Sequence, residues 1–576
     1  MRWRAASTLA LALASANALA DVRGWLGEHM RALMAEADIP AAVVAVVHGD
    51  ETWLLGEGVD VRNAVFRVGS VSKPVTASLV QLLVEAGTID LHEDLRGDLE
   101  SLPVSPPLQV PLTMHQLLTH TAGFNEKLFG QHVLEADRHI TLASYLAAEL
   151  PERFIEPGQI VAYNDHHTAL AGWILEQRSA EPFAQLAERL LFARLGMTRT
   201  SFEQIDLPRS VVRYLVVAGN GVGGTVYPRD YVQLPPAAGL FTTAPDMARY
   251  MRALLNAELP GSDVQLRVQF RHHENLPGRA YGFAEGLSGS LRYLYKDGQA
   301  SGFNARMVLV REERFGFFMA HNRNIFGALG RVEPAGRFGR RLGGALLERL
   351  WPERTSQVVE ALPAFDPVGK ADRYAGTYRT VIASRNTWER LVSLFDEAVL
   401  HADPGGVRLA GALYEPAGEH LFEHQNQPGR HIAFREHAGA ISHLFIGGGA
   451  YERVAWWSSS AAMPWVPGLA LAVLMFTAWR LWPVDKHLLW LSHAALVTFF
   501  PLVATLFATV DIQRFFHGPP TLMLVLLALP LLSLVGWGIA VLRLRRPRLV
   551  ERLLGAGAAA VLFAWLWHWR LLGYWL

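Results

Sequence analysis

The stretch "FRVGSVSKPVTASLVQLLVEAGTIDL", from Phe66 to Leu91, places Ser70 three residues before Lys73. Apolar side chains at helical spacing follow Lys73 and Gly87 is a typical helix stop, so the stretch predicts a helix that begins near Ser70. Residues three apart on a helix share a face, so Ser70 and Lys73 can touch. A lysine that loses its proton in a dry pocket can act as the base for a serine nucleophile. The Ser-x-x-Lys spacing alone is weak evidence for catalysis. Other motifs in the chain are needed to support a catalytic role.

Two companion motifs follow in the chain. "VAYNDHH" carries Tyr163 ahead of an apolar, helix-like run, and "YKDGQASGF" carries Lys296 ahead of a predicted strand. Together with Ser-x-x-Lys they resemble the signature of serine β-lactamases and penicillin-binding proteins. The resemblance is closest to class C β-lactamases and the related esterases and D-peptidases. It spans roughly residues 25–350, and "TMHQLLTHTAGF" and "AAGLFTTAPDMARYMRALL" fit it in the expected order.

The resemblance implies a role for each member of the site. Ser70 is expected to be the acylated nucleophile, and Lys73 its base or proton relay. Tyr163 would protonate the leaving group. Lys296 would lower the proton affinity of Tyr163 and pair with an anionic group of the substrate. The backbone amides of Ser70 and Gln299 would form the oxyanion hole.

Two departures from the family pattern bear on the substrate. The Asn of the family's Tyr-x-Asn triplet is Asp165 here, and Lys-Thr-Gly becomes a triplet that ends in Asp297 and Gly298. An ionised Asp165 cannot donate a hydrogen bond, and Asp297 adds negative charge where a substrate carboxylate would dock. These acids could pair with Lys73 and Lys296, or favour a neutral or cationic substrate. They could also mean that hydrolysis is lost and only binding remains.

Composition excludes several other classes of function. The 53 basic and 53 acidic side chains give no net charge, so nothing predicts a nucleic-acid partner. The chain has no cysteine, which removes disulfides, thiolate zinc sites and a cysteine nucleophile. The histidine pairs at residues 166–167 and 272–273 lack metal-ligand spacing. We therefore expect neither a metal nor another cofactor.

The chain divides into four predicted segments. Residues 1–20 have the layout of a secretory signal peptide: two arginines, an apolar run and a small-x-small site. The resemblance implies that residues 21–355 form an α/β (α+β) β-lactamase/transpeptidase-like domain, with an antiparallel sheet flanked by helices. Residues 365–455 are rich in Gly, Pro and short alternating runs, which predicts a small all-β barrel or sandwich. The fourth segment, residues 463–576, is a predicted membrane tail.

The predicted tail contains four apolar runs of about bilayer length. They are residues 465–482, 488–510, 519–542 and 553–576. Basic residues concentrate in the first and third loops between the runs, so the positive-inside rule places those loops in the cytoplasm. The catalytic domain then faces the periplasm or exterior, as the signal peptide also predicts. The span centres lack Asp, Glu, Lys and Arg, which favours a multi-pass inner-membrane anchor over a transport channel.

The sequence thus predicts a membrane-anchored, extracytoplasmic serine hydrolase. It would act through a serine acyl-enzyme on an ester or amide, in a small-molecule or peptidoglycan-like peptide substrate. Its predicted partners are that substrate and the lipid bilayer. The alternative is a catalytically silent membrane receptor or scaffold that uses the same pocket for binding.

Overall fold

The structure is a computed structural model. It describes residues 21–102, 109–208, 218–220, 226–323, 332–357, 361–362, 371–509, 516–518, 521–542 and 549–572. The predicted signal peptide, residues 1–20, lies outside the described residues, as do the ends of the last three predicted spans.

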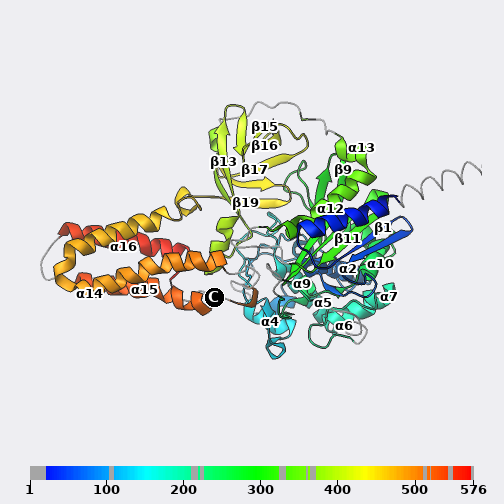
Figure 1. Cartoon of the computed structure of the whole chain (residues 1–576), viewed down its shortest axis with the longest axis horizontal. Helices are drawn as coiled ribbons and strands as arrows, with labels where there is room; N and C mark the ends of the chain where they lie inside the picture. Colours follow the sequence, from blue (N-terminus) through cyan, green and yellow to red (C-terminus); the bar gives the residue numbers. More distant parts are fainter. Residues whose placement is uncertain are drawn as a thin grey trace, which may run out of the picture.

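A seven-stranded antiparallel sheet forms the centre of the catalytic domain, with strand order β2-β1-β11-β10-β9-β8-β7. Its strands are β1 (Ala42–His48), β2 (Glu51–Glu57), β7 (Arg279–Ala280), β8 (Phe283–Ser288), β9 (Leu291–Ala300), β10 (Phe303–Val310) and β11 (Phe315–His321). Strands β10 and β11 are buried along their whole length because helices cover both faces of the sheet (Figure 1). The predicted antiparallel sheet flanked by helices is therefore confirmed.

The two faces of the sheet belong to two separate apolar cores. Val44 of β1 packs with Leu26 and Met30 of a helix over residues 21–36, and with Phe338 and Leu342 of α12. The alternate β1 residues face the other core, which contains the apolar side chains of α2, α5 and α10. The helices of this domain are α2 (Ser72–Glu85), α3 (Met114–Leu118), α4 (Leu142–Glu149), α5 (Asp165–Ser179), α6 (Phe183–Ala187), α7 (Ala193–Leu195), α9 (Pro235–Ala238), α10 (Ala244–Leu255), α11 (Ser262–Gln265), α12 (Pro334–Leu350) and α13 (Pro352–Ser356).

Short elements connect the longer strands and helices of the chain. Two small antiparallel pairs are β3 (Phe66–Arg67) with β6 (Phe241–Thr242), and β4 (His132–Val133) with β5 (Tyr231–Val232). The single-turn helices are η1 (Gly69–Val71), η2 (Asp98–Ser101), η3 (Ala136–Arg138), η4 (Glu188–Phe192), η6 (Arg311–Glu313), η8 (Ala371–Arg373) and η10 (Trp456–Ser458).

The second unit is a closed antiparallel barrel, which confirms the predicted small all-β unit and makes it a barrel rather than a sandwich. Its strands are β12 (Gly376–Thr380), β13 (Glu397–Asp403), β14 (Gly406–Leu409), β15 (Ala412–Gly418), β16 (Leu421–His424), β17 (His431–His437), β18 (Ala440–Ile446) and β19 (Gly449–Val454). The 3-10 helix η9 (Trp388–Phe395) lies between β12 and β13. His272 of the catalytic domain stacks on Phe445 of β18, with ring centroids 4.1 Å apart.

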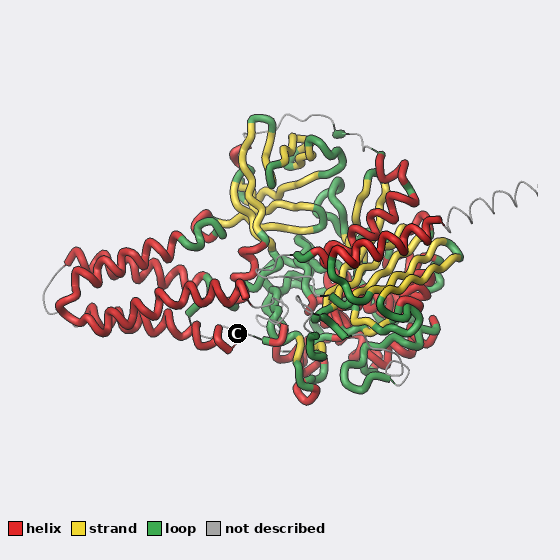
Figure 2. Tube along the Cα trace, in the orientation of Figure 1, coloured by secondary structure: helices red, strands yellow, loops and turns green. Residues whose placement is uncertain are grey.

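The C-terminal helices α14 (Trp465–Thr509), α15 (Thr521–Leu542) and α16 (Leu549–His568) lie side by side and project away from the catalytic domain (Figures 1 and 2). The first two predicted spans both fall within α14. Among the described residues, only Thr521–Ile539 is long and apolar enough to cross a membrane, and one such stretch is weak evidence for a membrane protein. Trp465–Thr477 and Leu553–His568 are shorter apolar helices.

Candidate active site

Ser70 lies in the 3-10 turn η1, directly before α2, which begins at Ser72. This turn fits closely against strand β9. Gly69 has a φ of +49°, and a Cβ atom there would lie 2.0 Å from the carbonyl oxygen of Gln299 and 2.6 Å from its amide nitrogen. A Cβ atom at Gly298 would lie 2.0 Å from the carbonyl oxygen of Val68. Glycine at both positions is what allows the Gln299 backbone to reach the serine turn, where the resemblance places the oxyanion hole.

Lys73 lies beneath Ser70 on the first turn of α2, and its side chain is only 1% exposed. Its Nζ donates to Ser70 Oγ at 3.0 Å and to the carbonyl oxygen of Ala237 at 2.9 Å, and it lies 2.6 Å from Asp165 Oδ1. Burial disfavours the charged ammonium, but the carboxylate of Asp165, followed by the contact with Tyr163, outweighs burial and raises the pKa of Lys73. The resting lysine is therefore protonated, unlike the deprotonated lysine that a dry pocket alone would give.

Tyr163 connects the serine to the second lysine. Its hydroxyl donates to Ser70 Oγ at 2.9 Å and accepts from Lys296 Nζ at 2.9 Å. Burial raises the pKa of Tyr163 to about 12, so its hydroxyl keeps its proton. Burial, followed by the charges of Lys73 and Arg279, holds the pKa of Lys296 well below its usual value. The expected lowering of the proton affinity of Tyr163 is thus not found, and Lys296 itself has the lowered pKa.

Asp165 is the first residue of α5, and the side chain of the N-cap residue Asn164 accepts from the His166 amide at 2.7 Å. This cap fixes the helix start, so that the Asp165 carboxylate points at Lys73. Burial raises the pKa of Asp165, but the charge and hydrogen bond of Lys73 lower it by more, and the net pKa is lowered. Of the alternatives that the sequence left open, the ion pair with Lys73 is therefore present.

Asp297 pairs with Arg306 of β10 at 2.5 Å rather than with Lys296. These two residues are direct cross-strand neighbours, and side chains alternate faces along β9. Lys296 is therefore directed at Tyr163, while Asp297 is directed at Arg306. The negative charge of Asp297 is thus compensated within the sheet, although the residue still borders the cavity at Ser70.

The cavity at Ser70 has a volume of about 390 Å³. It brings together all the predicted site residues except Lys73 and Gly298, which lie directly behind it. Sequence reasoning missed other residues that line it, namely Glu126, Leu128, Gln131, His132, Ala238, Arg279, Ala284, Tyr295, Ala300, Ile382 and Phe516. Glu126 follows the "HTAGF" motif closely and could have been found from it. For Ile382 and Phe516 the sequence gives no signal, because they come from the barrel and the C-terminal tail.

His120, in the "HTAGF" motif, lies behind the site. Its ring is 4.6 Å from that of Tyr163, and its Nδ1 accepts from the Asn164 amide at 3.4 Å. Burial holds the pKa of His120 well below its usual value, so the ring is neutral and can accept this hydrogen bond. His120 therefore positions the segment that carries Tyr163 and Asp165.

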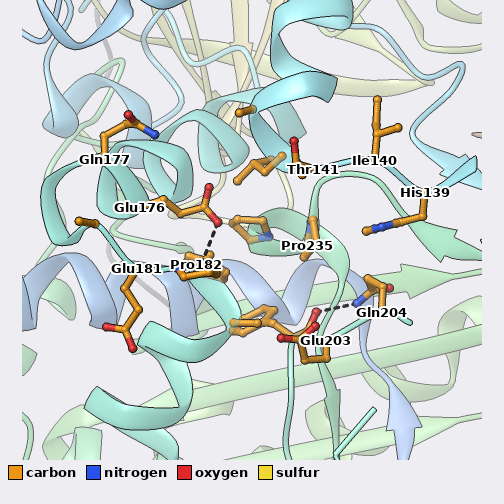
Figure 3. A pocket seen from close by; sticks show the side chains of 17 residues that line it. His139, Ile140, Thr141, Glu176, Gln177, Glu181, Pro182, Glu203, Gln204 and Pro235 are labelled. Atoms are coloured by element: carbon orange, nitrogen blue, oxygen red, sulfur yellow. Dashed lines mark hydrogen bonds between the residues drawn. The ribbon is translucent and has the colours of Figure 1, made fainter. Parts of the chain in front are cut away.

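A larger cavity of about 590 Å³ lies at the C-terminal end of α5 (Figure 3). It is bordered by Glu176, Glu181 and Glu203, but Glu176 accepts from the Phe183 amide and Glu181 pairs with Arg189. Of the described residues that line it, none is a predicted site residue. The greater volume therefore does not mark the reactive centre.

One group of described residues has metal-ligand geometry: His132, Asp230 and His517, whose ligand atoms all lie within 4.8 Å of one another. The Asp230 carboxylate already has partners. Arg67 pairs with one oxygen, and the other lies within hydrogen-bond distance of His132 Nδ1 and His517 Nε2 and accepts from Ser301 Oγ. These contacts satisfy the Asp230 carboxylate without an ion. The expectation that the protein needs no metal stays a prediction.

Comparisons with known proteins agree with this geometry. The beta-lactamase family model matches residues 26–337, more than half of the chain, and the chain belongs to that family. It is a serine hydrolase of the β-lactamase and penicillin-binding-protein class. A beta-lactamase of Providencia stuartii is 23% identical over 360 residues, covering 55% of this chain and 91% of that protein. The D-alanyl-D-alanine-carboxypeptidase/endopeptidase AmpH of Escherichia coli (strain K12) is 23% identical over 292 residues, covering 46% and 72%.

Among solved structures, SurE is similar over 76% of this chain and 100% of its own, with a TM-score of 0.52 and 22% sequence identity. At this identity the likeness shows the fold alone.

Proposed function

We propose that this protein is a membrane-anchored, extracytoplasmic serine hydrolase in which Ser70 forms an acyl-enzyme with an ester or amide. The observation that carries the proposal is the convergence on one oxygen: Ser70 Oγ accepts hydrogen bonds from both Lys73 and Tyr163, at 3.0 and 2.9 Å. Two buried donors on a serine oxygen at the edge of a cavity are typical of an activated nucleophile.

Each polar group has a step in this proposal. Neutral Lys73 takes the proton from Ser70 as its oxygen attacks the carbonyl carbon, and Asp165 controls how much neutral lysine exists. The amides of Ser70 and Gln299 stabilise the oxyanion, at ~3 kcal/mol each. Tyr163 gives its proton to the leaving alcohol or amine, and the Lys73 ammonium, which is hydrogen-bonded to the Tyr163 hydroxyl, passes on the proton that it took from Ser70. Lys296 holds the Tyr163 hydroxyl in place by its hydrogen bond. Water then releases the acyl group by the reverse sequence.

The charges argue against a cationic substrate. Asp165 is compensated by Lys73, and Asp297 by Arg306, so neither acid is free to attract a cation. Small-molecule esters and D-amino-acid peptides both satisfy this condition. The name of the similar carboxypeptidase/endopeptidase supports the peptide.

We further propose the division into residues 1–20, 21–355, 365–455 and 463–576, with the last segment as an inner-membrane anchor. The positive-inside pattern and the apolar stretch Thr521–Ile539 support it. The contact of His517 with Asp230 also supports the orientation, because it needs the second tail loop on the same side as the catalytic domain. Protease added to cells with a permeabilised outer layer should digest the catalytic domain, and a protected domain would contradict this orientation.

Covalent labelling tests the catalytic proposal. The full chain in detergent should react with a fluorophosphonate probe, and Ser70→Ala should abolish the labelling. Ser144→Ala, a partly exposed serine on α4, is the matched control and should label like the parent. Labelling by a fluorescent penicillin would narrow the substrate to cell-wall peptides or lactams. A folded protein that no acylating probe labels would instead support the silent receptor.

A further inference from the structure

Residues 516–518, which connect the second and third predicted spans, lie against the catalytic domain. His517 Nε2 is 3.0 Å from Asp230 Oδ2, and the Phe516 ring stacks on His132 with centroids 5.2 Å apart. Asp230 is buried, and its partner Arg67 lies three residues before the nucleophile Ser70. This tail segment is therefore held by the same framework that positions the nucleophile.

Phe516 lines the cavity that contains Ser70. Two other large apolar side chains line the same cavity: Leu128 of the catalytic domain and Ile382, which follows the first barrel strand. Ile382 keeps 38% of its surface exposed, so it has apolar area left for a ligand to cover. The three parts of the chain thus each supply one apolar side chain to the lining of this cavity.

The residue next to Leu128 packs against the tail helices. Phe129, next to Leu128, is buried in one apolar cluster with Trp388 of η9 and with tail residues such as Leu527 and Leu566. The cavity lining at Leu128 is therefore continuous in the chain with a residue that packs against the tail. The acids at the reacting end are compensated, so they do not attract a cationic head group.

We propose that Phe516, Leu128 and Ile382 form a subsite for the acyl or alkyl chain of an amphiphilic ester or amide. Phe516, supplied by the C-terminal tail, is then a specificity-determining residue of the hydrolase. This inference rests on the proposed function and adds the substrate class: a neutral reacting group that carries a long apolar chain. The tail thereby contributes to substrate recognition as well as to anchoring.

The test compares chain lengths on the full protein in detergent micelles. The ratio of kcat/KM for the p-nitrophenyl octanoate over the acetate should be high in the parent and fall about ten-fold in Phe516→Ala, since a few methylene contacts are lost. His517→Ala, which frees the segment from Asp230, should lower the ratio in the same direction. Phe395→Ala, an exposed phenylalanine on η9 outside the cavity lining, is the matched control and should keep the parent ratio.

A second measurement does not depend on turnover. The rate constants for inactivation by octyl and ethyl fluorophosphonates should show the same chain-length ratio and the same fall in Phe516→Ala, and the labelled fraction reports folded sites. An unchanged ratio in Phe516→Ala, by both readouts, overturns the inference and leaves the hydrolase intact. A folded parent that neither ester nor fluorophosphonate acylates overturns the proposed function itself, and the inference with it.

Discussion

Replacing Asp165 by asparagine tests the ion pair between Asp165 and Lys73. The amide has the size of the carboxylate and restores the Tyr-x-Asn pattern that the family resemblance implies. It removes the negative charge that lies 2.6 Å from Lys73 Nζ. What remains around Lys73 is a buried environment, which favours the neutral amine.

The size of the effect follows from the ion pair. An opposite charge at this distance shifts a pKa by one to three units, so we expect the pKa of Lys73 to fall by about 2 units, or ~2.7 kcal/mol. In the parent the pKa of Lys73 is raised above its ordinary value, so about 0.1% or less of the lysine is neutral at pH 7.5. Asp165→Asn should therefore increase the neutral fraction about 100-fold.

The assay is the rate of fluorophosphonate labelling of Ser70 as a function of pH. If neutral Lys73 is the base, Asp165→Asn should label about 100-fold faster at pH 7.5, and the rising limb of the pH profile should move about 2 units lower. Asp98→Asn is the matched control, because Asp98 pairs with Arg178 at the surface and not with the site. It should leave both the rate and the profile as in the parent.

An unchanged or slower labelling rate in a folded Asp165→Asn protein would refute the assignment of Lys73 as the base. The proton would then have to leave Ser70 through Tyr163 and Lys296, whose lowered pKa makes it the other acceptor.

The loss of stability in Asp165→Asn should depend on pH in a definite direction. The pKa of Asp165 is lowered, so its contribution is present above its unfolded pKa near 4 and is lost as pH falls through its folded pKa. The pKa of Lys73 is raised, so its contribution is present below about pH 10 and is lost as pH rises through its folded pKa. Urea unfolding should show a loss of at most about 3 kcal/mol at pH 7, since Lys73 can shed its proton. The loss should shrink below about pH 4 and become small only below the folded pKa of Asp165.

Two further predictions concern the serine turn and the His132 cluster. Gly69→Ala would place a Cβ atom 2.0 Å from a backbone oxygen at a φ of +49°, so it should cost about 2–4 kcal/mol in urea unfolding and abolish labelling. Gly344→Ala, in open space on α12, should be neutral or stabilising. Chelator treatment should leave labelling and Tm unchanged, because Asp230 already has protein partners; a Tm that rises with added zinc would contradict this.

The cluster of residues around Ser70 could be predicted from the sequence because its members lie in short motifs. Ser70 and Lys73 lie at the start of one helix. Tyr163 and Lys296 each lie in a triplet that can be matched to a motif of the β-lactamase family. The sheet and the barrel were predictable for a similar reason, since strand alternation and turn residues are local signals.

The electrostatics of the site were not predictable in the same way. Which lysine is protonated depends on burial and on the partner of each acid, and both are set by tertiary contacts. Asp297 lies next to Lys296 in sequence, yet its partner is Arg306 across the strand pair, because neighbouring side chains on a strand point to opposite faces. Phe516 and Ile382 carry no signal at all, since no local pattern relates them to Ser70.

The arrangement of the three units gives a reason for a tail larger than a tether requires. Arg379 of the barrel is buried, pairs with Glu397 at 2.7 Å and lies over the ring of Trp569 at the end of the tail, 5.0 Å from its centroid. Trp388 joins the same tail cluster through η9. The barrel is thus packed against the tail, while Ile382 lies between these contacts in sequence and lines the cavity. Ile382 and Phe516 thus reach the cavity from two units that pack against each other, so the tail is part of the framework around Ser70.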